Sequence, residues 1–256
     1  FNGFIKLSPN LGGVLGVIFA AFVFAFIEKK LRKVVPPSLD LLIIPVLTIL
    51  AGGIITIAIV MPVAAVLMKG VTFILLDIML NKSGIIGGYV LAASFLPLVM
   101  LGIHQGLTPV HIQLIQDYGY SVLFPILGMA GAGQVGSAIA ILVKTKNKKL
   151  KELISSALPA GFLGIGEPLI YGVSLPLFYP FITACLGAGF GGAVLAAAKN
   201  VGSKTIGPSG LVLLVVADSN RSTAWCLVAL MASYLGGFIL TYLFGYNEKM
   251  LERLED

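Results

Sequence analysis

The sequence is poor in charge. Only 11% of its 256 residues are Asp, Glu, Lys or Arg, whereas 58% are hydrophobic. Soluble domains carry about a quarter charged residues, so this composition excludes an ordinary soluble globule. It also excludes intrinsic disorder, which requires few apolar side chains and much charge. We therefore interpret the chain as one that crosses a membrane several times.

Cysteine is scarce as well, and several catalytic patterns are missing. Cys185 and Cys226 lie inside apolar stretches without ligand spacing, which excludes a disulfide framework and favours simple packing. The absence of a GxxxxGK[ST] motif argues against an ATP-driven pump. The sequence shows no metal-ligand cluster and no Ser/His/Asp set with motif spacing, since Ser209 lies in GPSGL rather than GxSxG.

Long apolar runs account for most of the chain. At about 20 residues per crossing, the length allows about six to eight spans. The runs are 11–27, 41–68, 71–80, 84–103, 120–143, 176–198 and 223–246. Residues 41–68 are too long for one simple span, so this run is either kinked or divided near Pro62. The predicted fold class is an all-α polytopic membrane protein.

The net charge of +6 comes from cations that cluster beside apolar runs, which membrane topology explains better than nucleic-acid binding. One cluster occupies 29–33 and the other 144–151. Both should be cytoplasmic, because short loops rich in Lys and Arg stay on that side. An even number of crossings must then separate them, which favours dividing 41–80 into two spans. Residues 28–35 could lie along the membrane surface, and the polar tail 247–256 should be cytoplasmic.

The most informative segment is 152–175, in which moderately apolar halves flank a Gly-rich centre carrying Glu167. A carboxylate at bilayer depth costs several kcal/mol unless it faces a cavity or a partner. Gly164, Gly166 and Pro168 would interrupt a helix at this point, and irregular backbone at membrane depth must be buried in protein or line water. We predict a re-entrant hairpin whose tip presents Glu167 to a polar cavity. A surface loop with a solvated glutamate is the alternative.

A second polar segment, 104–119, holds both histidines and is too polar to face lipid. His104 and Gln105 can both donate and accept hydrogen bonds, as sugar hydroxyl groups require. His104 could instead cap a helix. His111, Gln113 and Gln116 are weaker candidates.

A third segment, Gly207–Gly210, is a turn with exposed N–H groups that could hold an anion or a hydroxyl group, and Lys204 nearby could add charge. A plain inter-helix turn is the alternative. Gln134 is a polar residue among small ones, and it could bond another helix or line the cavity.

The motif GIGEPLIYGVSLP at 164–176 resembles the signature of the membrane-embedded IIC component of sugar phosphotransferase systems. The similarity is to the glucose superfamily, in its sucrose/β-glucoside/N-acetylmuramic acid branch, which carries G-[IV]-[TG]-E-P-x-[IL]-Y-G. Further stretches resemble family elements in the same order: EKKLRKVVPPSLD at 28–40, GIHQGLTP at 102–109, KTKNKKLK at 144–151 and SGL at 209–211.

The resemblance implies about ten transmembrane helices, two re-entrant hairpins and a homodimer with an elevator-like movement. Residues 1–103 would be the rest of a scaffold half with an interfacial basic segment at 28–38. Residues 104–247 would be the transport half with the sugar site, and 248–256 a cytoplasmic tail. Because the chain starts at Phe1, we expect it to be part of a longer protein, with the first spans and the IIB domain missing.

The resemblance also implies the chemistry, which is that of a protein-Npi-phosphohistidine–sugar phosphotransferase in the bacterial inner membrane. The phosphoryl group passes from phosphoenolpyruvate through enzyme I, HPr, IIA and IIB, whose phosphocysteine donates it to the sugar. No cofactor or metal is implied. Glu167 would be the catalytic residue. The implied substrate-binding residues are His104, Gln105, Gly166, Glu167, Ser209 and Gly210.

Two departures bear on the substrate: Gln105 stands where many relatives have a second histidine, and Gly166 where many have threonine. The motif looks most like that of the N-acetylmuramic acid members, whose sugar carries a lactyl carboxylate. Lys204, Arg221 or backbone N–H groups near Ser209 could accommodate it. Sucrose, a β-glucoside or trehalose are alternative substrates. A proton-coupled secondary sugar transporter and a non-transporting structural membrane protein are alternatives of other classes.

Overall fold

The computed structural model describes residues 13–248 and 250–251. Their contacts divide the chain into two compact units, Phe1–Phe73 and Ile74–Asp256. The start of the first apolar run and most of the predicted tail 248–256 lie outside the described residues. The predicted division into a scaffold half and a transport half at residue 103 concerns movement during transport, and it stays a prediction.

The first unit is helical. It contains α1 (Gly13–Leu31), η1 (Pro37–Leu39), α2 (Asp40–Ile55), η2 (Thr56–Val60) and α3 (Met61–Thr72). Helix α1 ends just before a turn, and Arg32 joins both sides of that turn through Glu28 at 2.7 Å and Asp40 at 3.2 Å. The predicted surface segment 28–35 is therefore the last turn of α1 followed by a loop, and it forms no separate helix.

The long apolar run continues without a break from Asp40 to Lys82, through η3 (Phe73–Lys82), as a 43-residue helical segment. The expectation that residues 41–80 divide into two spans is therefore wrong. Pro62 lies at the start of α3, directly after the π-helical turn η2. A wider turn there accommodates a residue that has no amide donor, which explains why Pro62 does not end the helix.

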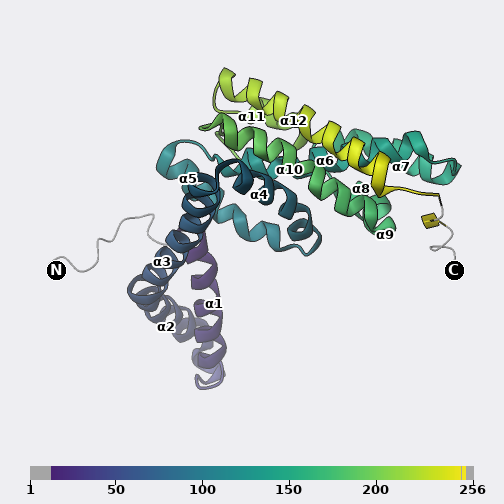
Figure 1. Ribbon diagram of the computed structural model, residues 1–256. Coiled ribbons are helices and arrows are strands. Elements are labelled where there is room, and N and C mark those ends of the chain that lie inside the picture. The colour runs from purple at the N-terminus through teal and green to yellow at the C-terminus, as the bar shows by residue number, and fades with distance from the viewer. Residues whose placement is uncertain (1–12, 249, 252–256) are drawn as a thin grey trace. The chain divides into compact units, whose positions relative to one another are not determined.

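The second unit is a bundle of longer helices joined by short broken ones. Figure 1 shows α6, α10 and α12 running alongside one another, and α4 packs on α10 and α6. The described part of this unit contains isolated β-bridges but no strand. Its elements are α4 (Gly84–Met100), η4 (Ile103–Leu107), α5 (Thr108–Tyr118), α6 (Leu123–Lys144), α7 (Lys148–Phe162), α8 (Glu167–Leu169), η5 (Ile170–Ser174), α9 (Leu175–Leu177), α10 (Tyr179–Ala198), η6 (Gly210–Val212), α11 (Leu213–Val216), α12 (Asn220–Leu240) and η7 (Thr241–Gly245).

Glycine lets these long helices approach one another at backbone distance. A Cβ on Gly133 of α6 would lie 2.4 Å from the carbonyl oxygen of Ala184 on α10. A Cβ on Gly237 of α12 would lie 2.1 Å from the carbonyl oxygen of Gly133. Small residues at such crossings are typical of helices packed within a membrane. The contact fixes α6 at the centre of the bundle, where it forms one wall of the site described below.

Buried polar contacts add to this packing. The hydroxyl group of Thr241 lies 2.7 Å from that of Thr183 and donates to Ser137 Oγ at 2.8 Å, which links η7, α10 and α6. Cys185 and Cys226 are free and buried, which confirms their predicted packing role.

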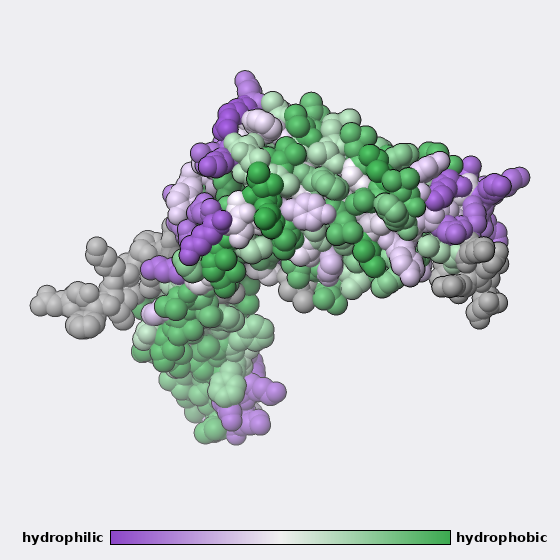
Figure 2. Space-filling view, in the orientation of Figure 1, coloured by the Kyte–Doolittle hydropathy of each residue, from purple (hydrophilic) through white to green (hydrophobic). Residues whose placement is uncertain are grey.

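Among the described residues, four helical segments are long and apolar enough to cross a membrane: Asp40–Lys82, Leu123–Lys144, Tyr179–Ala198 and Asn220–Gly245. Figure 2 shows a broad hydrophobic surface over the second unit, with hydrophilic residues gathered at its two ends. These features agree with the predicted all-α polytopic fold. Lys144, in the second basic cluster, is more than a solvated charge, because its ammonium group donates to the carbonyl oxygens of Tyr242 and Tyr246 at 2.7 Å each.

Candidate functional site

The glutamate predicted at a hairpin tip lies at one. Helix α7 ends at Phe162, and α8 begins at Glu167 after a turn. The two arms are antiparallel, because Gly161 faces Leu169 near the turn and Gly172 faces Leu153 farther away. The break follows from the sequence, since Gly164 has a φ of 90°, a conformation that side chains with a Cβ rarely adopt.

The loop that carries Ser209 packs directly on this hairpin turn. A Cβ on Gly164 would lie 2.2 Å from the carbonyl oxygen of Ser209. A Cβ on Gly210, which has a φ of 64°, would lie 2.4 Å from the carbonyl oxygen of Phe162. Ser209 Oγ also donates to the carbonyl oxygen of Gly164 at 3.4 Å. Two glycines therefore hold the predicted third segment against the turn that precedes Glu167.

His104 and Gln105 lie on η4, between α4 and α5. Gln105 Nε2 is 3.1 Å from His104 Nε2, and the Thr108 hydroxyl group donates to Gln105 Oε1 at 3.4 Å. Because the amide nitrogen can only donate, this arrangement assigns His104 an accepting Nε2 and a proton on Nδ1. The ring stands edge-on to Phe95, with centroids 6.0 Å apart.

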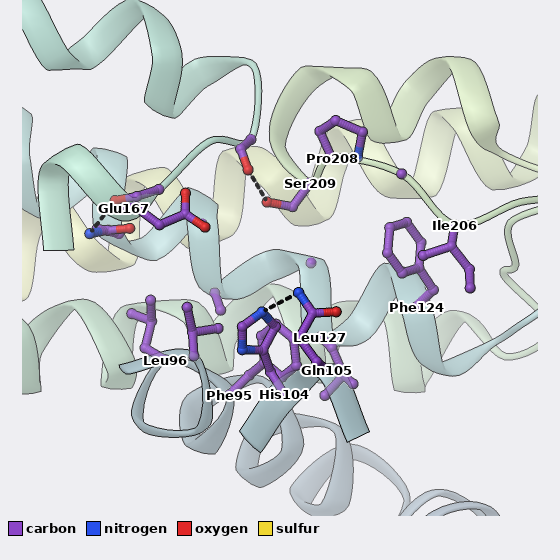
Figure 3. Close-up of a pocket in the computed structure, with 18 of the residues that line it drawn as sticks. Phe95, Leu96, His104, Gln105, Phe124, Leu127, Glu167, Ile206, Pro208 and Ser209 are labelled. Carbon is purple, nitrogen blue, oxygen red and sulfur yellow. Dashed lines mark hydrogen bonds between the residues drawn. The ribbon is translucent and has the colours of Figure 1, made fainter. Parts of the chain in front are cut away.

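These segments surround one cavity of about 210 Å³ in the second unit. Its wall includes Glu167, His104, Gln105 and Ser209, from three broken segments that are far apart in the sequence. Figure 3 shows Glu167 and Ser209 facing His104 and Gln105 across the open space. The Glu167 side chain is exposed to this space, and in the described part of the chain no cation or hydrogen-bond donor pairs with its carboxylate. The carboxylate is therefore available to a ligand.

Two buried polar atoms of residues in the cavity wall, His104 Nδ1 and Gln134 Oε1, have no hydrogen-bond partner among the described residues. Gln134 is 1% exposed, and its Nε2 donates to the carbonyl oxygen of Gly166 at 3.2 Å. Because a carbonyl oxygen only accepts, this bond identifies which atom of the amide is the nitrogen and leaves Oε1 as the unpaired acceptor. An unpaired buried polar atom costs about 1–3 kcal/mol.

Gly166 matters for the same reason. A Cβ at this position would lie 2.7 Å from Gln134 Oε1. A threonine at this position, which many members of the family with the similar motif carry, would thus displace the Gln134 amide. The departure at Gly166 and the polar residue in α6 form one structural unit, although they are 32 positions apart.

Several other predicted residues lie elsewhere. Gly210 is buried against Phe162 and is not among the lining residues. Lys204 is exposed outside the wall, and Arg221 donates to the carbonyl oxygen of Ala198 at 2.7 Å, where it caps α10. Gln113 donates to Asp117 at 2.9 Å. None of these residues lines the cavity.

The sequence interpretation assigned no site role to most of the α6 wall. Phe124, Leu127, Gly128, Gly131 and Gln134 all line the cavity. Leu127 and Gly128 are adjacent, and the other positions follow at intervals of three or four residues, which places the set on one helical face. That spacing was visible in the sequence, but an apolar stripe alone does not distinguish a cavity wall from a packing face.

The family can now be stated from comparison with known proteins. The family model described as "Phosphotransferase system, EIIC" matches residues 4–188. This chain belongs to the phosphotransferase system EIIC family. With its apolar helices, the EIIC chain is a multi-pass protein of the bacterial cytoplasmic (inner) membrane.

Similar proteins occur in two staphylococci. The EIIC chain is 47% identical over 245 residues, 95% of its length, to the PTS system MurNAc-GlcNAc-specific EIIBC component of Staphylococcus epidermidis, of which it covers 51%. It is 46% identical over 245 residues to the protein of the same name from Staphylococcus aureus, of which it covers 50%. The chain thus spans about half the length of these relatives. No solved structure matches it.

Proposed function

We propose that this chain is the sugar-translocating part of a phosphotransferase permease and that its substrate is N-acetylmuramic acid, alone or linked to N-acetylglucosamine. The observation that carries the proposal is the cavity in which Glu167, His104, Gln105 and Ser209 meet. Membership of the EIIC family supports the reaction class. The names of the staphylococcal relatives support the sugar.

The proposed reaction transfers a phosphoryl group from a phosphocysteine on IIB to a sugar hydroxyl group. The hydroxyl oxygen attacks phosphorus, the phosphorus–sulfur bond breaks, and the cysteine leaves as a thiolate. The Glu167 carboxylate, which has no partner in the described part of the chain, accepts the hydroxyl proton. His104 and Gln105 orient the sugar from the opposite wall (Figure 3). Catalysis is then mainly positioning for in-line transfer.

The lactyl carboxylate of N-acetylmuramic acid requires hydrogen-bond donors. Because Lys204 and Arg221 lie outside the cavity wall, we assign this role to the backbone N–H groups of Gly207 and Ser209, which flank Pro208 in the turn that lines the cavity.

The proposal also includes partners and movement. We expect a homodimer in the lipid bilayer, with IIB and IIA as phosphoryl-transfer partners. We also expect an elevator-like movement of the transport half, residues 104–247, against the scaffold half.

The test uses inside-out vesicles that contain this chain together with phosphoenolpyruvate, enzyme I, HPr, IIA and IIB. N-acetylmuramic acid and the disaccharide should be converted to sugar phosphates, whereas sucrose should not. Accumulation of free sugar with protons would instead indicate a secondary transporter. A Glu167→Gln variant that assembles normally and still phosphorylates at the wild-type rate would contradict the assignment of Glu167.

A further inference from the structure

The cavity is elongated along α6. Its wall follows one face of this helix from Phe124 to Gln134, a separation of ten residues. At about 1.5 Å per residue, this face is about 15 Å long. Figure 3 shows Glu167 at one end of the cavity and Phe124 and Ile206 at the other. This length exceeds that of a single pyranose ring.

His111 lies at the end remote from Glu167. Its ring stands edge-on to Phe124, with centroids 5.5 Å apart and an interplanar angle of 87°. The residue lines the cavity although its side chain is only 4% exposed. A buried imidazole in a cavity wall needs a hydrogen-bond partner for each ring nitrogen. The described residues around His111 provide a partner for only one of its two nitrogens.

Ser121 occupies the Nδ1 side of the ring. Ser121 Oγ is 3.1 Å from His111 Nδ1 and accepts a hydrogen bond from the backbone N–H of Phe124 at 3.3 Å. Ser121 is fully buried, so its hydroxyl proton also needs an acceptor. Among the described residues, His111 Nδ1 is the acceptor within reach. The hydroxyl group therefore donates to Nδ1, and the imidazole proton lies on Nε2.

The second nitrogen is left as a fixed donor. No hydrogen bond from His111 Nε2 to a protein atom is found within residues 13–248 and 250–251. Burial lowers the pKa of His111 to about 4, so the ring is neutral near pH 7 and keeps this tautomer. An aromatic ring beside a single directed donor is the combination of apolar wall and few polar groups that small-molecule sites use.

We propose that His111 and Phe124 form the subsite for the second ring of a disaccharide, in which His111 Nε2–H donates to an oxygen of that ring. The first ring, which carries the hydroxyl group to be phosphorylated, then lies at the Glu167 end. This inference rests on the proposed function and adds a specificity-determining residue to it.

The experiment compares the disaccharide of N-acetylmuramic acid and N-acetylglucosamine with N-acetylmuramic acid alone. A His111→Phe variant removes the donor but keeps a ring. We expect the Kd of this variant for the disaccharide to rise at least tenfold and its Kd for the single sugar to change less than twofold. Ser121→Ala removes the hydroxyl group that keeps the proton on His111 Nε2. Its Kd for the disaccharide should rise less than that of His111→Phe, and its Kd for the single sugar should again change little. Tyr118→Phe, at a position on the same helix that is 65% exposed and outside the cavity wall, is the matched control and should bind both sugars normally.

Two results would overturn the subsite. One is unchanged disaccharide affinity in His111→Phe, and the other is an equal loss for both sugars. If His111→Phe fails to assemble, Phe124→Leu tests the same subsite, because it removes the aromatic face at the same end. A Phe124→Leu variant whose Kd changes from the wild-type value by the same factor for both sugars would then refute the inference. Failure of the proposed function is distinguishable, since the wild-type protein would phosphorylate neither sugar.

Discussion

Replacement of Gly164 by alanine tests how the site is assembled. The hairpin turn and the Ser209 loop meet at this glycine, which has a φ of 90°. A non-glycine residue in such a conformation costs about 1–3 kcal/mol. The added Cβ would also lie 2.2 Å from the Ser209 carbonyl oxygen, a backbone atom that cannot rotate away. Overpacking of this kind adds about 1–3 kcal/mol.

The two effects together predict a loss of roughly 2–6 kcal/mol in the free energy of unfolding. They also predict at least a tenfold rise in the Kd for N-acetylmuramic acid, because the Ser209 loop must move away from Glu167. Gly172→Ala is the matched control in the same hairpin, since its Cβ would come no closer than 3.7 Å to Leu153. Thermal unfolding and calorimetric titration of the purified proteins measure both quantities. If the Gly164→Ala and Gly172→Ala variants have the same Tm and the same Kd, the contact between Gly164 and Ser209 does not hold the site together.

Three further variants test other parts of the structure. Glu167→Gln should abolish sugar phosphorylation in vesicles and leave the Tm within a few degrees of wild type, because the carboxylate has no partner among the described residues to lose. Retained turnover would contradict the role of Glu167. His104→Ala should weaken sugar binding by at least about 1.4 kcal/mol, or tenfold, in calorimetric titration; an unchanged Kd would return His104 to a purely structural role. Gly237→Ala should prevent normal assembly in size-exclusion chromatography, because its Cβ would lie 2.1 Å from the Gly133 carbonyl oxygen, whereas Gly70→Ala, with nothing within 4 Å, should assemble normally.

The sequence by itself determined the properties that depend on local composition. Low charge and long apolar runs fix the membrane class, since each span must satisfy its own backbone hydrogen bonds. The Gly164 to Pro168 pattern determined the hairpin turn and the position of Glu167 at the start of α8. Cys185 packs as its apolar surroundings predicted. In each case the deciding interaction lies within one helix or turn.

Tertiary structure decided the rest. Whether Pro62 divides a run depends on the π-helical turn before it, which no local propensity reveals. The wall formed by α6, the bond between Gln134 and Gly166, and the contact between Gly164 and Ser209 join residues more than 30 positions apart. The proton on His111 Nε2 depends on a buried serine ten residues away. Such features arise only when distant backbones approach closely enough for directional hydrogen bonds, and residue type alone does not specify that approach.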